Sequence, residues 1–86
     1  MATRIERDCD TSTGLVRTIR TIGGQVVVAF EDGRVCLVSA VPTSGFAVSV
    51  DRGPDRLSVT LAKPGARAVV DAYAEGNRTS VRQVVG

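Results

Sequence analysis

Short apolar runs alternate along the chain with polar segments that contain glycine, proline, asparagine or aspartate. Fifteen of the 86 residues are valine, and most of them fall in these runs. A β-branched side chain is stiff at χ1 and packs well on a pleated surface, so the runs favour strands. Their spacing is that of a strand followed by a turn. The pattern therefore predicts a chain of β-hairpins.

Seven strands follow from the runs and from the turn residues between them. The expected strands are residues 15–22, 25–31, 34–41, 46–50, 57–61, 66–73 and 78–85. For two of these segments a helix is the alternative to a strand. Apolar residues in 15–22 also fit helical spacing, and the alanine-rich run 66–73 also suits a short helix.

The strongest turn signal is Asp32-Gly33, which suits a tight type I′ hairpin. With this pair at the tip, the register of the two strands is fixed. It sets Glu31 opposite Arg34, Phe30 opposite Val35, Ala29 opposite Cys36 and Val28 opposite Leu37. Both faces of this hairpin are apolar in the middle. We therefore expect it to lie centrally, covered on two sides or wrapped in a curled sheet.

Strict alternation assigns an inner face to the next two strands. The residues expected to point inward are Phe46, Val48, Val50, Leu57, Val59 and Leu61. Only 3% of the residues are aromatic, so the core must consist mainly of aliphatic side chains. Phe30 and Phe46 are the expected large anchors.

These elements predict an all-β protein with one domain, residues 14–86, preceded by a flexible polar N-terminal arm, residues 1–13. The expected architecture is a small antiparallel β-sandwich of about seven short strands. A partly open small barrel is the alternative. A chain of this length buries only about 60% of its unfolded surface, so the core is modest.

Charge and hydropathy set limits on partners. The net charge is +2, which is too small to imply nucleic acid by itself. No run of about 18 apolar residues occurs, and no apolar stretch follows the first residues, so we expect neither membrane insertion nor a signal peptide. We expect the chain to be cytoplasmic if it is complete, and extracytoplasmic if it is part of a membrane-anchored protein.

The two cysteines, Cys9 and Cys36, are too few for a zinc site, and the chain has no histidine to complete one. Cys36 lies in mid-strand, which favours a small buried apolar residue. Cys9 lies between two aspartates. A disulfide between the two cysteines in an oxidising compartment is the alternative.

Residues suited to catalysis are scarce. Without histidine no serine or cysteine triad can form. The acids fall largely in turns, where aspartate bonds to the backbone. Asp71 is the only acid expected inside a strand, with Arg67 as its candidate partner. We therefore expect that the chain has no enzymatic activity and binds neither a cofactor nor a metal ion.

The candidate binding residues are Arg17, Arg20, Arg78, Arg82 and Tyr73. The four arginines suit one side of a small nucleic-acid-binding barrel. However, single-strand binders also need aromatic stacking platforms, and arginines that alternate with apolar residues also protect edge strands from aggregation. Tyr73 combines an apolar ring with a polar tip, and a place at a sheet edge also accounts for it.

From Gly23 onward, several short motifs resemble a β-rich C-terminal module of actinobacterial membrane-anchored or exported proteins of uncharacterised function. The motifs are Gly23-Gly24-Gln25-Val26, residues 33–42 from Gly33 to Pro42, Gly45-Phe46, Val48-Ser49-Val50, Gly53-Pro54, Leu57 and Val59. The resemblance ends near Gly76. It implies a cysteine near each of Phe30 and Tyr73, where this chain has the aromatics instead. The resemblance implies no catalytic residues in this chain.

The predicted function is that of a non-enzymatic interaction or structural β module, and the resemblance implies the envelope-facing part of a larger actinobacterial protein. We expect a protein partner, or self-association through an edge strand, either residues 15–22 or residues 78–85. The alternative is a small-barrel nucleic-acid-binding protein that uses Arg17, Arg20, Arg78 and Arg82.

Overall fold

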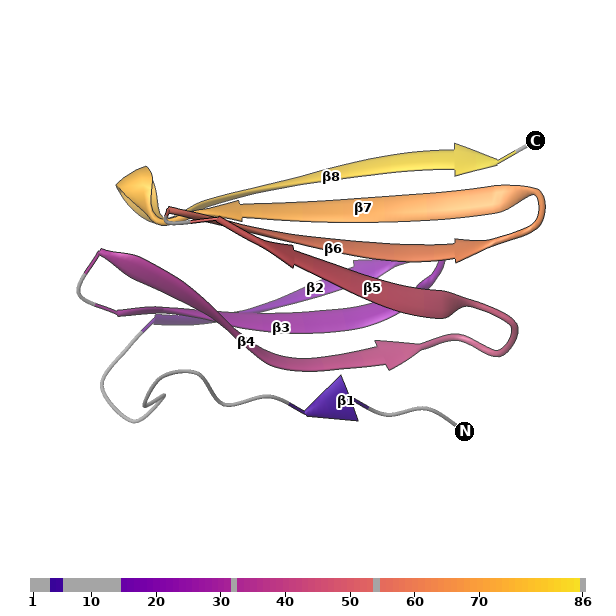
Figure 1. Ribbon diagram of the computed structural model, residues 1–86, viewed down its shortest axis with the longest axis horizontal. Helices are drawn as coiled ribbons and strands as arrows, with labels where there is room; N and C mark the ends of the chain where they lie inside the picture. The colour runs from indigo at the N-terminus through magenta and orange to yellow at the C-terminus, as the bar shows by residue number, and fades with distance from the viewer. Residues whose placement is uncertain (1–3, 6–14, 32, 54, 86) are drawn as a thin grey trace.

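A computed structural model describes residues 4–5, 15–31, 33–53 and 55–85, and it has two antiparallel sheets packed face to face (Figure 1). The elements are β1 (Arg4–Ile5), β2 (Leu15–Thr21), β3 (Gly24–Glu31), β4 (Arg34–Pro42), β5 (Ala47–Arg52), β6 (Arg56–Lys63), β7 (Ala66–Tyr73), the 3-10 helix η1 (Glu75–Asn77) and β8 (Arg78–Val85). The predicted small β-sandwich of seven strands is confirmed, with the two-residue β1 in addition. The helical alternatives for 15–22 and 66–73 are wrong, and the sheets do not close into a barrel.

The chain forms its two sheets one after the other. The first sheet has the order β1-β4-β3-β2 and the second the order β5-β6-β7-β8. Between them, residues 43–46 carry the chain across. The Thr43 N–H donates to the Gly23 carbonyl (2.8 Å), and the Phe46 N–H donates to the Thr43 carbonyl (3.0 Å). The strands β2-β3-β4 and β5-β6-β7-β8 therefore each form a meander, while β1 pairs with β4 at the other edge of the first sheet. The crossing is tied to the β2–β3 turn.

The segment expected as a polar arm, residues 1–13, contributes β1. Arg4 pairs with Ala40 and Ile5 pairs with Ser39 on β4. The rest of that segment lies outside the described residues. β1 therefore covers two positions along the edge of the first sheet.

The predicted register of the β3–β4 hairpin is confirmed for all four pairs, from Glu31 with Arg34 to Val28 with Leu37. Beyond them the register shifts by one residue, so that Val27 pairs with Ser39 and Val26 with Ala40. This β-bulge at Val38 has a clear effect on the core. Without the bulge, Ser39 would lie opposite Val26 and face inward, whereas with it Ala40 takes that place.

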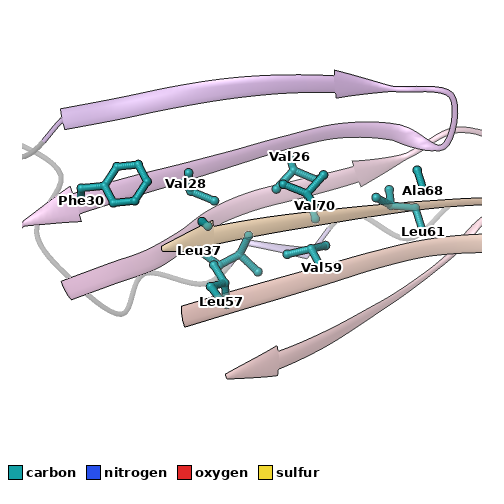
Figure 2. Close-up of a cluster of buried hydrophobic side chains, with 11 residues drawn as sticks. Val26, Val28, Phe30, Leu37, Leu57, Val59, Leu61, Ala68 and Val70 are labelled. Atoms are coloured by element: carbon teal, nitrogen blue, oxygen red, sulfur yellow. The ribbon is translucent and has the colours of Figure 1, made fainter. Parts of the chain in front are cut away.

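The core lies between the sheets, where aliphatic side chains from both inner faces point toward one another (Figure 2). Its buried members are Val26, Val28, Phe30, Leu37, Ala40, Leu57, Val59, Leu61, Ala68, Val70 and Ala72. The inward residues predicted on β5 and β6 are confirmed, although Phe46, Val48 and Val50 are only partly buried. Phe46 lies at the margin, with the Lys63 ammonium 5.0 Å from its ring centroid.

One row of valines crosses the whole second sheet on its inner side. Val50 pairs with Val59, Val59 with Val70, and Val70 with Val81. Val59 and Val70 are fully buried, but Val81 is 40% exposed. The row therefore runs from the core to the outer edge of β8 and stops there.

The β2–β3 turn packs closely against the second sheet at Gly23. A Cβ atom on this residue would lie 2.7 Å from Leu61 Cβ and 2.9 Å from Phe46 Cδ2. Both distances are shorter than ordinary van der Waals contact. Glycine is therefore required here because the two sheets approach each other too closely for a side chain.

We predict that Gly23→Ala lowers the free energy of unfolding by about 1–3 kcal/mol, because the added methyl group overpacks the contact with Leu61. Chemical denaturation followed by circular dichroism measures the change. Gly53→Ala is the matched control, since its nearest neighbour, the Arg56 carbonyl, would be 3.7 Å away. Equal stability of the two variants would contradict the close approach.

Candidate interaction surface

β8 is the outermost strand of the second sheet, and nothing in the described chain pairs with its outer edge (Figure 1). All of its residues are exposed except Thr79, which is half-buried. Three of them are valines, with Val84 66% and Val85 74% exposed. An edge strand offers a row of backbone N–H and C=O groups to any chain that can pair with it.

β2, the outer strand of the first sheet, lies on the same flank of the sandwich. The Ile22 N–H, in the turn after β2, donates a 2.7 Å hydrogen bond to Gln83 Oε1 on β8. Leu15 and Val16 are each 45% exposed on this strand. Within the described residues, the flank therefore combines two unpaired strand edges with exposed aliphatic side chains.

The outer face of the second sheet carries Tyr73 between two arginines. Arg56 on β6 and Arg78 on β8 each lie directly opposite Tyr73 in the sheet. The Arg78 guanidinium is 5.7 Å from the tyrosine ring centroid, and its Nε–H donates to the Glu75 carbonyl (3.4 Å). The arrangement is a cation–π contact at the end of the sheet.

A shallow hollow lies beside Tyr73. It is lined by Gly33, Asp55, Arg56, Tyr73, Ala74 and Glu75. Arg56 was missing from the candidate residues, although the Pro64-Gly65 turn fixes its place opposite Tyr73. Because the lining mixes acids with an arginine, its charge singles out no class of ligand.

Asp71 is the buried charged residue of the described chain, at 5% exposure, and it lies on the same outer face. Its carboxylate Oδ2 is 3.3 Å from the Arg82 guanidinium on β8. The expectation that Arg67 pairs with Asp71 is therefore wrong. Arg67 lies four residues away along the same strand, whereas Arg82 lies diagonally across on the neighbouring strand, where a long side chain reaches the carboxylate.

The four candidate arginines do not form one surface. Arg17 lies opposite the core residue Val28, so it faces the second sheet at the flank, and Arg20 faces the other side of β2. Arg78 and Arg82 lie on the outer face of the second sheet. Arg17, Arg20 and the pair Arg78 and Arg82 therefore point in three different directions.

Cys36 is buried, as predicted, but it takes part in a disulfide and is not a free thiol. It lies opposite Ala29, on the side of the first sheet that faces away from the core. Both residues are buried, so the first sheet is covered on two sides there. Cys9, the other cysteine of the sequence, lies outside the described residues.

Within the described part of the chain, acids and cysteines do not gather into a group that would hold a metal ion. No helix there is long and apolar enough to span a membrane. Comparisons with protein-family models, curated proteins and solved structures found no match. The resemblance to actinobacterial modules therefore remains a prediction.

We predict that the Asp71–Arg82 pair contributes about 0.5–1 kcal/mol to stability, since one partner is buried and the other is mostly exposed. A double-mutant cycle with Asp71→Asn and Arg82→Gln measures the interaction by urea denaturation. The cycle with Arg67→Gln in place of Arg82→Gln is the control and should give no coupling energy. A coupling of equal size with Arg67 would overturn the assignment.

Proposed function

We propose that this chain is a non-enzymatic interaction module that binds a protein strand along the outer edge of β8. The observation that carries the proposal is the exposure of β8, whose outer edge is unpaired within the described residues. Strand addition to a sheet edge is a common mode of recognition, in which backbone hydrogen bonds provide affinity and side chains provide specificity.

β8 supports this role better than β2 does. It is longer, with eight residues against seven, and its valines reach 66% and 74% exposure. Ile19 of β2 also packs on the core, which ties that strand more closely to the sandwich. A partner on β8 would cover apolar surface that the fold leaves in water.

The disulfide at Cys36 supports work in an oxidising compartment, because cytosolic thiols are kept reduced. This agrees with the envelope-facing role that the resemblance implies. The surroundings of the one buried acid in the described residues support a non-enzymatic role. Asp71, the buried acid, is engaged by Arg82 and surrounded in the sheet by Ser58 and Ser80, which suits a structural pair.

The alternative, nucleic-acid binding, is weakened by the division of Arg17 and Arg20 from Arg78 and Arg82. We predict that a fluorescent oligothymidine does not bind at either roughly 50 or roughly 200 mM salt, where a phosphate-driven complex would differ steeply. Fluorescence anisotropy makes the measurement. Binding that falls with salt and is lost in Arg78→Gln would favour the alternative.

We predict that a photo-crosslinking amino acid in place of Val84 captures a discrete partner in the cells that produce the protein, since this exposed residue lies on β8. The same substitution at Ser44, an exposed residue of the β4–β5 crossing, is the control. Mass spectrometry of the adducts identifies the captured chain. Equal capture at both positions, or none at either, would contradict a binding edge on β8.

A further inference from the structure

The sequence of β8 is complementary to itself. We propose that the strand bound at this edge is β8 of a second copy, in an antiparallel pair with the two Val81 residues on the two-fold axis. The second sheets of the two copies, each with four strands, then form one continuous sheet. This inference rests on the proposed function and names the partner at the same edge.

Symmetry limits the registers that are available. A two-fold axis that pairs two identical antiparallel strands stands perpendicular to the sheet, so inward residues face inward residues. One residue of β8 then lies on the axis opposite its own copy. Each register is therefore defined by that central residue.

Charge selects one of these registers. With Ser80 on the axis, Arg78 faces Arg82 twice, and with Arg82 on the axis that residue faces itself. Like charges directly opposite each other destabilise a strand pair. With Val81 on the axis, Arg82 faces Ser80, and residues 78–84 all pair. Registers centred on residues 79 or 83 pair fewer residues of the strand.

The Val81 register also completes the apolar row of the second sheet. Val50, Val59, Val70 and Val81 cross one copy on its inner side, and the same row continues in reverse through the partner. The 40% of Val81 that is exposed in the single chain becomes covered. Arg78 faces Val84, where its aliphatic stem covers the valine.

Substitutions at Ser80 test the register, because their effects on the single chain and on the dimer have opposite signs. Ser80 lies opposite Asp71 in its own sheet and is expected to lie opposite Arg82 of the second copy. Ser80→Arg places a positive charge beside Asp71, which favours the single chain, but it opposes Arg82 across the axis twice. Ser80→Glu reverses both effects.

Sedimentation equilibrium measures the dimer, and thermal unfolding at low protein concentration measures the single chain. We expect Ser80→Arg to weaken the dimer about tenfold without lowering the Tm, and Ser80→Glu to strengthen it about tenfold while the Tm falls. If both variants weaken the dimer, or if neither changes it, the Val81 register is wrong.

Cysteine substitution gives a second, independent readout. In the proposed register the two Val81 Cα atoms lie about 4.5–5.5 Å apart, within the range that a disulfide spans. We expect Val81→Cys to form a covalent dimer on mild oxidation. Val85→Cys is the control, because residue 85 is more exposed in the single chain but lies far from its own copy in the pair. Equal cross-linking at the two positions would show random collision and overturn the register.

The two proposals fail in different ways. A chain that stays monomeric at high concentration, yet is captured at Val84 by a different protein, overturns self-pairing and leaves the binding edge in place. A monomeric chain with no adduct at Val84 overturns both. Capture of a second copy at Val84, together with the Ser80 effects, supports both.

Discussion

The fold depends on one constraint: the inner face of each sheet finds its apolar partner in the other. The meander β2-β3-β4 packs its valines and leucine against the aliphatic inner face of β5-β8. A slip of one residue in a strand with a buried inner face would turn that face to water, so burial fixes the registers of β3, β4, β6 and β7. The bulge at Val38 satisfies this constraint by exchanging Ser39 for Ala40 on the inner side. Gly23 satisfies it where the β2–β3 turn meets Leu61.

The same constraint accounts for the strand edges that the fold leaves unpaired within the described residues. Face-to-face packing stabilises the middle of each sheet, but it leaves backbone groups unpaired along the outer strands. On one flank both outer strands, β2 and β8, are linked by the Ile22–Gln83 hydrogen bond and still expose aliphatic side chains. Arginines on an edge strand disfavour the pairings that set like charges opposite each other. On β8 they oppose each other in two registers and leave the one centred on Val81 open.

Much of the fold could be predicted from the sequence because its strongest signals are local. Asp32-Gly33 sets the hairpin register as far as Leu37, and strict alternation sets the inner faces of β5 and β6. The bulge at Val38 depends on which side the distant second sheet covers, and no local signal marks it. The partner of Asp71 was missed for a similar reason. Arg67 lies on the same strand as Asp71, whereas the ion pair runs diagonally from Asp71 to Arg82 on β8. The place of Arg56 beside Tyr73 likewise depends on the pairing of β6 with β7.

The disulfide at Cys36 bears on how so small a core holds two sheets. A chain of this length buries a modest share of its unfolded surface, and its core here consists mainly of valine, leucine and alanine. A cross-link restricts the unfolded chain and so raises stability without a larger core. Cys36 lies opposite Ala29 on the face away from the core, so the cross-link acts where packing between the sheets does not reach. The disulfide therefore adds a covalent restraint on the face of the first sheet that points away from the second sheet, where Ala29 and Cys36 are also buried.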